Sequence, residues 1–299
     1  MNSLKIDKQA LEMARRQFCL DIGLPWKEYL REPGQKAYIR KAVYKEGTRL
    51  NDVPGARNYE GRDDFFHAMI CLGQLFLVVD EQIYDWAVEK FAGYPVEWFC
   101  EYGNLRRIDE KLREFGHQIK DTHVYFLPET GTSSCSCQEP GQEMPASDPK
   151  GGKCSAESDF LQEWYDQQEI LEFRESNRFT SAICFSKTQP DMLAVAAIKN
   201  GMQPGKHNKY DQSRMQGMAG VSADGEYLWQ IGINVVKEFE GRGLATDLVR
   251  TMKEAVVSLG KTPFYGTSES HTISQTVGLK AGFVPAWTEV YASPVSKEV

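Results

Sequence analysis

The alternation of apolar and polar positions is most regular in the C-terminal half of the chain. Apolar runs of strand length lie at 192–198, 218–221, 228–236, 262–267 and 283–291. Segments with helical spacing lie at 159–174, 244–259 and 273–281. The longest stripe of this kind is formed by Leu244, Leu248, Met252, Ala255 and Leu259. The succession of strand, helix, strand, helix and strand predicts parallel strands joined by crossover helices.

The N-terminal part of the chain predicts a second, smaller mixture of helices and strands. Helical spacing covers 4–20, 80–91 and 104–115, and strand-like runs cover 65–72, 74–79 and 123–128. Gly73 marks a tight connection between two of the strands. Asp80 is a suitable N-cap, and Gly116 is a suitable stop for the helix before it. No pattern in this part indicates chemistry by itself.

A polar segment divides the chain into two predicted domains. Residues 130–158 are rich in Ser, Gly, Pro and charge, so they cannot bury enough apolar surface to offset the entropy of ordering. We interpret them as a linker or insertion between an N-terminal α+β domain, 1–129, and a C-terminal domain, 159–299. The linker cysteines have no fourth ligand nearby, so no metal is predicted; they are Cys135, Cys137 and Cys154.

Composition and charge narrow the class of protein. The chain has 299 residues, of which 41% are apolar, and a formal net charge of −7. This charge argues against a protein that coats nucleic acid, and no apolar run approaches the roughly 20 residues of a membrane helix. The first residues do not resemble a secretory signal. The other cysteines stand among apolar neighbours, and we expect them to be buried thiols in a reducing cytoplasm; they are Cys19, Cys71, Cys100 and Cys184.

A glycine-rich turn separates the strongest predicted strand from the longest predicted helix. It reads Glu240-Gly241-Arg242-Gly243-Leu244-Ala245. The first turn of a helix carries N–H groups without intrahelical partners, and the helix dipole adds positive charge there. Glycines allow a phosphate to approach these groups closely. The turn lacks the features of a dinucleotide fingerprint or a Walker loop, and a tight connection without a ligand is the alternative interpretation.

Two motifs in a fixed order give the C-terminal half a family resemblance. The first is a strand that runs into [Q/R]-x-x-G-x-[G/A], here 240–245, and then into a helix. The second is Ser-His-Thr-Ile-Ser at 270–274, followed by Leu-Lys-Ala-Gly-Phe at 279–283. With this order and spacing, the chain from about 191 to 291 resembles the GNAT superfamily of N-acetyltransferases. Glu240 replaces the usual Gln or Arg, and Ser270 replaces a frequent Asn.

The resemblance implies an α/β (α+β) fold with a mixed central sheet and flanking helices. In this family a parallel strand pair splays apart to admit acetyl-CoA. The pantetheine arm is then expected to pair like an added strand with the backbone of Ile233, Asn234 and Val235. The pyrophosphate is expected on the amides of Gly241, Arg242, Gly243, Leu244 and Ala245, beside the Thr246 hydroxyl. Ser270 and Ser274 are expected to approach the pantetheine or thiol end from the other side.

The resemblance also directs attention to a group that protonates the departing thiolate. Many members carry a tyrosine for this purpose at the position of Gly278. We predict that Tyr265 supplies the acid instead, with Ser274 and His271 as further options. A packed aromatic is the alternative for Tyr265, and water could also serve as the acid.

A general base must lie within reach of the acceptor amine, directly or through water. Glu226 is the first candidate and Asp224 the second, since both precede the strand at 228–236 on the side where acceptors enter in this family. The alternative is that Asp224-Gly225-Glu226 is only a polar hairpin turn. The histidines show no metal spacing, and we interpret His67, His117, His123 and His207 as structural or exposed.

The function implied is direct transfer of an acetyl group from acetyl-CoA to a primary amine of a small molecule or peptide. The N-terminal domain is expected to pack over the acceptor side or to add a strand, such as 123–128, to the sheet. A non-catalytic acyl-CoA-binding or regulatory module is the alternative, and an interaction protein with a purely structural turn is a third. We expect no nucleic acid or membrane as partner, and a homodimer is compatible with the sequence.

Overall fold

The computed structural model describes residues 5–42, 44–45, 48–49, 54–58, 63–131, 160–199 and 208–295. The α-helices are α1 (Lys8–Asp21), α2 (Trp26–Tyr29), α3 (Tyr84–Phe91), α4 (Tyr102–Arg113), α5 (Gln167–Ile170), α6 (Leu244–Ser258) and α7 (Thr272–Lys280). The strands are β1 (Ala37–Ala42), β2 (Tyr44–Lys45), β3 (Thr48–Arg49), β4 (Asp63–Cys71), β5 (Gln74–Asp80), β6 (His117–Pro128), β7 (Phe160–Asp166), β8 (Asp191–Lys199), β9 (Met215–Ala223), β10 (Leu228–Val235), β11 (Thr262–Thr267) and β12 (Phe283–Pro294). The linker cysteines and His207 lie outside the described residues.

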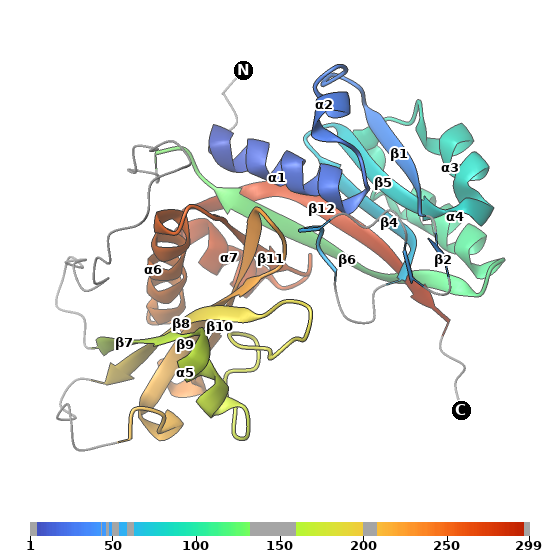
Figure 1. Ribbon diagram of the computed structural model, residues 1–299. Helices are drawn as coiled ribbons and strands as arrows, with labels where there is room; N and C mark the ends of the chain where they lie inside the picture. The colour runs from blue at the N-terminus through green and yellow to red at the C-terminus, as the bar shows by residue number, and fades with distance from the viewer. Residues whose placement is uncertain are drawn as a thin grey trace.

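One mixed sheet of ten strands runs through both halves of the chain, in the order β1-β5-β4-β12-β6-β11-β10-β9-β8-β7 (Figure 1). Helices α3 and α4 pack on the same face as α6 and α7, which we call the α6 face. Helix α1 covers part of the opposite face, the α1 face, above β6, β10 and β11. The two segments of the chain on either side of 130–158 therefore share one sheet instead of forming a sheet each.

The two longest strands hold the halves together by crossing between them. Strand β6 ends the N-terminal half and pairs antiparallel with β11 of the C-terminal half. Strand β12 ends the C-terminal half and pairs antiparallel with both β6 and β4. The prediction that 123–128 adds a strand to the C-terminal sheet is confirmed. The last strand, β12, is consequently not adjacent to β11, because β6 lies between them.

A buried ionic network joins α1 to β12, the last strand of the C-terminal half. The Arg57 guanidinium lies 2.7 Å from the Asp21 carboxylate of α1 and 2.7 Å from the Glu289 carboxylate of β12. His67 of β4 contacts Glu289 at 2.8 Å, and the Trp287 indole N–H donates to the same carboxylate. The network therefore ties α1, the turn at Arg57 and two strands of the sheet to one another.

Most predicted elements exist, but the helix predicted at 159–174 does not. Residues 160–166 form the edge strand β7, which pairs antiparallel with β8, and only short helical turns follow. The aromatic residues of this segment favour a strand, and the available edge of β8 satisfies its backbone, which sequence spacing cannot reveal. The predicted apolar stripe of α6 is also displaced, because Leu259 is exposed while Val249 and Val256 are buried.

Two of the cysteines expected to be buried are exposed. Cys100 and Cys184 both lie in connecting segments at the surface, whereas Cys19 and Cys71 are buried. Burial raises the pKa of each of the latter thiols to about 12, so both remain protonated at neutral pH. Apolar neighbours in sequence did not identify these two connections as surface segments.

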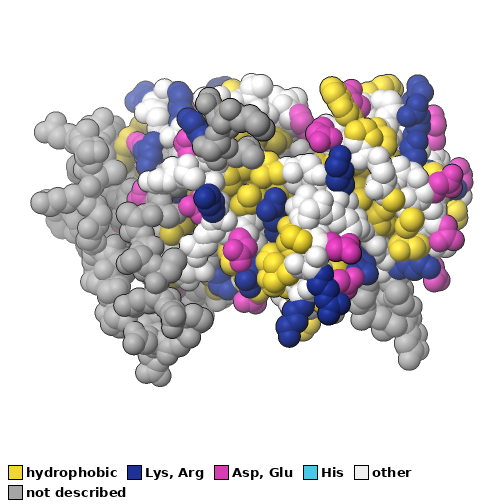
Figure 2. Space-filling view, turned by 90° about the horizontal axis from the view of Figure 1, so that it is seen from above, with side chains coloured by type: hydrophobic (Ala, Val, Ile, Leu, Met, Phe, Trp, Pro, Cys, Tyr) yellow, Lys and Arg dark blue, Asp and Glu magenta, His cyan; other side chains and the backbone are white. Residues whose placement is uncertain are grey.

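The surface seen from above shows no continuous field of one charge. Lys and Arg side chains alternate there with Asp, Glu and hydrophobic side chains (Figure 2). Among the described residues of this face, the basic side chains form no continuous stripe (Figure 2). Within the described residues, no helix is long and apolar enough to cross a membrane.

Candidate active site

Strands β10 and β11 part in the middle of the sheet. They pair in parallel only from Leu228 to Ile231 and from Thr262 to Tyr265. Beyond this point β10 continues to Val235 and pairs, among the described strands, with β9 alone, while β11 continues and pairs with β6 alone. Residues 232–235 are half-buried rather than buried, although they belong to a central strand. The structure thus contains the splayed pair that the resemblance implies.

The glycine turn follows β10 and keeps its amides available. Gly241 and Gly243 have φ of 72° and 87°, a left-handed conformation that favours glycine. A Cβ built on either residue would meet no atom within 4 Å, so the space beside the turn is open. No acceptor in the described part of the chain bonds the N–H groups of the predicted residues Gly241, Arg242, Gly243, Leu244 and Ala245. Unpaired amides at the positive end of α6 form an anion-binding arrangement.

Arg242 adds a full positive charge beside these amides. Its guanidinium carbon lies 5.2 Å from the ring centroid of Phe239, in the short turn that connects β10 to the glycines. Phe239 in turn contacts Phe160 of β7, with ring centroids 5.8 Å apart. The aromatic contact supports the exposed cation where a phosphate would approach. Thr246 follows in the first turn of α6 and is half-buried.

A buried hydroxyl lies at the end of β11, past the point where the strands part. Thr267 is only 6% exposed, and its Oγ1 has no hydrogen-bond partner among the described residues. A buried hydroxyl without a partner is unfavourable, so a polar ligand that pairs with it would stabilise the site. The unpaired amides, the open glycines and this hydroxyl together fit a diphosphate that carries an amide-containing arm, as acetyl-CoA does.

Tyr265 and Ser274, both predicted from the sequence, meet on the α6 face. The Tyr265 hydroxyl and Ser274 Oγ lie 2.7 Å apart, joining β11 to α7. Burial raises the pKa of Tyr265, while the hydrogen bond to Ser274 lowers it. Ser270 lies in the turn before α7 and is exposed. His271 is the N-cap residue of α7 but makes no side-chain capping bond.

The α1 face of the opening is covered by a segment that sequence reasoning did not identify. The Asn234 side-chain oxygen accepts the backbone N–H groups of Ser181 and Ala182, at 2.7 and 3.0 Å. A Cβ on Gly232 would lie 1.8 Å from the Ser181 carbonyl oxygen, and one on Gly220 would lie 2.0 Å from that of Ala182. Two glycines on adjacent strands therefore let this backbone rest directly on the sheet. In the sequence, the only sign of this close approach is a glycine in each of the two strands.

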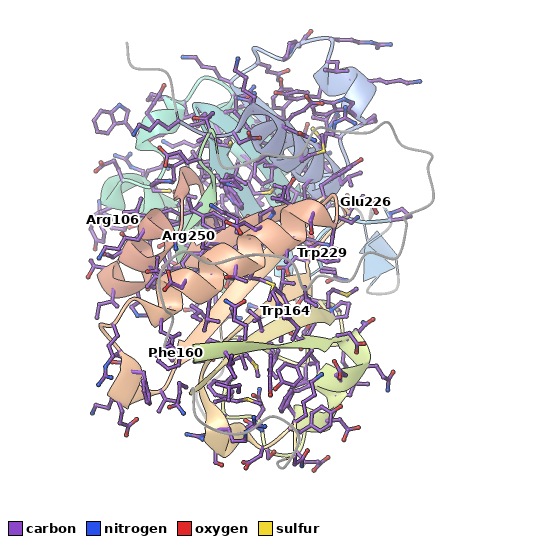
Figure 3. All side chains as sticks on the ribbon, turned by 90° about the vertical axis from the view of Figure 1, so that its left-hand side faces the viewer. Arg106, Phe160, Trp164, Glu226, Trp229 and Arg250 are labelled. Atoms are coloured by element: carbon purple, nitrogen blue, oxygen red, sulfur yellow. The ribbon has the colours of Figure 1, made fainter. Side chains whose placement is uncertain are left out.

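The predicted bases lie away from the glycine turn. Glu226 sits in the turn before β10, with a side chain 55% exposed and 3.7 Å from the Lys261 ammonium. Lys261 follows the C-terminal end of α6, so Glu226 lies at the end of this helix opposite the glycines (Figure 3). Asp224 is buried and accepts the Ser222 hydroxyl at 2.6 Å. The structure therefore does not bring these carboxylates together with Tyr265 and Ser274.

Comparison with known proteins supports the resemblance at the level of the fold. Residues 221–292 match the family model described as FR47-like protein. This range contains the splayed strands, the glycine turn and α7, so the similarity to GNAT proteins is confirmed for this part of the chain. The molecule has a mixed α+β fold whose C-terminal half is GNAT-like. A search of curated proteins gave no match.

Several solved structures are similar to this chain at low identity. A GNAT-family protein from Novosphingobium aromaticivorans has 14% identity and a TM-score of 0.36 over 60% of this chain and 69% of its own. A GCN5-related N-acetyltransferase from Kribbella flavida has 13% identity and a TM-score of 0.39, with 63% of each chain covered. The protein yncA from Salmonella typhimurium, solved with its cofactor acetyl-CoA, has 12% identity and a TM-score of 0.31 over 48% of this chain and 97% of its own.

Proposed function

We propose that this protein is an N-acetyltransferase that moves an acetyl group from acetyl-CoA directly to a primary amine. The observation that carries the proposal is the opening between β10 and β11, which leads to five unpaired amides at the start of α6. A diphosphate on these amides would place its arm along the free edge of Ile233, Asn234 and Val235. Acetyl-CoA, when bound, supplies an activated thioester at the point where the strands part.

The residues around this point can assist both ends of the transfer. Backbone N–H groups on the free edge of β10 can polarise a carbonyl without reorganisation. The Tyr265 hydroxyl, held by Ser274, can donate a proton to a departing thiolate, because burial keeps it protonated at neutral pH. Fixed positioning of the amine beside the thioester supplies a further share of the rate.

Removal of the proton from the amine is a separate requirement. The geometry gives Glu226 no direct path to the opening, since its exposed carboxylate is paired with Lys261 before β10, and the paired stretch from Leu228 to Ile231 separates it from the point where the strands part. Direct proton removal by Glu226 is therefore disfavoured, and a relay through water is the remaining route for this carboxylate.

The decisive experiment combines binding and turnover in the full-length chain. Calorimetric titration with acetyl-CoA should give saturable binding, and thiol release should accelerate when primary amines are added. Binding without acceleration by any amine would favour a non-catalytic acyl-CoA-binding module. If acetyl-CoA gives neither heat nor thermal stabilisation, the chain does not bind it, and the proposed acetyltransferase activity is ruled out.

A further inference from the structure

Gly266 lies on β11 directly beyond the end of the parallel pairing, and its α1 face is covered by neighbouring side chains. A Cβ built on Gly266 would lie 2.6 Å from Tyr125 Cε1 of β6 and 3.2 Å from Gln230 Nε2 of β10. Cε1 is the ring carbon next to the one that bears the hydroxyl. The Tyr125 ring from β6 and the Gln230 amide from β10 therefore both lie over Gly266, one from each strand beside β11.

Both groups have unused hydrogen-bonding capacity. Neither the Tyr125 hydroxyl nor the Gln230 amide bonds to a described residue, and neither is among the fully buried atoms that lack a partner, so both reach solvent and are open to a ligand. A hydroxyl and an amide that stay open to solvent beside the parting strands can bind a polar ligand.

Tyr125 is held in a fixed position. Its ring stacks on Trp287 at 4.9 Å and 11° and lies 5.8 Å from Phe264. Burial, and then the nearby Glu289 carboxylate, raise the pKa of Tyr125 well above its usual range. The hydroxyl is therefore neutral at physiological pH and can both donate and accept a hydrogen bond.

Tyr125 and Gln230 lie on the opposite side of the sheet from Tyr265, the proposed acid. Tyr265 packs into the core of the α6 face, whereas Tyr125 belongs to the core cluster under α1 on the opposite face. The two tyrosines thus flank the parting strands from opposite sides. The segment at Ser181 covers the α1 face at Gly232, two residues beyond Gln230 along β10. An acceptor reaching the thioester from the α1 face would pass between these groups.

We propose that Tyr125 and Gln230 position the acceptor by binding a hydroxyl or amide group adjacent to its amino group. This inference rests on the proposed function and deepens it, since it assigns part of acceptor recognition to a strand from the N-terminal half. The acceptor class is a primary amine with a neutral hydrogen-bonding group nearby, as in amino alcohols and amino-acid amides. The two residues act by positioning and take no part in proton transfer.

The test compares amines of similar size that differ in this group. Ethanolamine and glycinamide carry a hydroxyl or an amide, and propylamine carries neither. With the wild-type chain, we expect kcat/KM for ethanolamine or glycinamide to exceed that for propylamine by about tenfold, because a site built for a hydrogen bond discriminates against an analogue that lacks it. Tyr125→Phe and Gln230→Met should each raise the KM for the polar amines by about fivefold, with propylamine unchanged.

Matched controls separate this role from a structural one and from failure of the proposed function. Tyr94→Phe removes a hydroxyl from a half-buried tyrosine far from β11 and should leave every KM unchanged. Acetyl-CoA titration should give the same affinity in all variants, whereas loss of binding in the wild type would refute the proposed function itself. Thiol release that is no faster with the polar amines than with propylamine, or equal KM values in wild type and variants, would overturn the inference.

Discussion

The ring of Tyr265 lies against the bare backbone of Gly278. A Cβ built on Gly278 would be 3.0 Å from Tyr265 Cδ1, tighter than an ordinary contact. The position at which the family resemblance expects a tyrosine is thus small, and a tyrosine from β11 lies beside it and reaches Ser274 on the same helix. Strand β11 thus places a tyrosine hydroxyl beside α7, which has glycine at the position where a tyrosine was expected.

This relationship predicts a catalytic loss when the hydroxyl alone is removed. Tyr265→Phe should lower kcat roughly 10²-fold, the lower end of the contribution of a positioned proton donor, and leave the acetyl-CoA affinity unchanged. Ser274→Ala should have a smaller effect, because the phenol remains. Steady-state kinetics with any accepted amine measures both. A kcat for Tyr265→Phe within twofold of wild type would show that water protonates the thiolate.

The pH dependence of kcat follows from the direction of the same pKa. Burial is the main influence and raises the pKa of Tyr265 above its ordinary value of 10.0, so the hydroxyl that must donate a proton stays protonated as pH rises to 10. No loss of kcat from this group is therefore expected between pH 7 and about 10. Ser274 lowers the pKa, so Ser274→Ala should move the descending limb to still higher pH. A limb below pH 9 that disappears in Tyr265→Phe would contradict the assignment.

Cofactor binding can be separated from backbone strain by two glycines at opposite ends of α6. Gly243 and Gly260 both have left-handed φ, at 87° and 72°, and a Cβ on either would meet no atom within 4 Å. Alanine at each position should cost about 1 kcal/mol of unfolding free energy through strain. Only Gly243→Ala places a methyl group beside the unpaired amides, so only this variant should weaken acetyl-CoA binding, by about tenfold in titration calorimetry. Equal affinities in the two variants would mean that the diphosphate binds elsewhere.

Glu226 offers a simple test of the predicted base. The Glu226 carboxylate is exposed and paired with Lys261. We therefore expect Glu226→Gln to change kcat by no more than about twofold and to leave the pH profile of kcat unchanged. The measurement is kcat against pH for both proteins with one amine. A roughly 10²-fold fall, together with loss of the acidic limb, would instead establish Glu226 as the base.

The proposed cofactor half of the site could be predicted from local sequence because its geometry is local. A strand, two glycines and an amphipathic helix follow one another in the chain, and the unpaired amides are a property of any helix start. The opening itself lies between β10 and β11, which the crossover pattern already placed side by side. Tyr265 and Ser274 could be named as candidates for the same reason, since strand alternation and the motif order place them near α7.

The proposed acceptor half of the site could not be predicted, because segments distant in the sequence form it. Tyr125 reaches Gly266 only because β6 enters the C-terminal sheet between β11 and β12, and its rotation there is set by long-range pairing. The strand was expected in this sheet, but its register and neighbours were not. Asn234 was predicted for its backbone, while its side chain holds Ser181, from a connection that has no regular pattern. Sequence spacing describes one element at a time and does not specify such contacts.

The buried network around Arg57 predicts a large stability effect at a distance from the chemistry. The side chains of Arg57 and Asp21 are both 0% exposed, and the guanidinium also contacts the buried Glu289. Arg57→Ala leaves two buried carboxylates without this cation, so it should lower the free energy of unfolding by about 3–5 kcal/mol. Arg106→Ala is the matched control, since its pair with Glu110 is exposed on both sides and should contribute no more than about 0.5 kcal/mol. Urea denaturation measures both variants, and equal midpoints would show that the network does not hold α1 on the sheet.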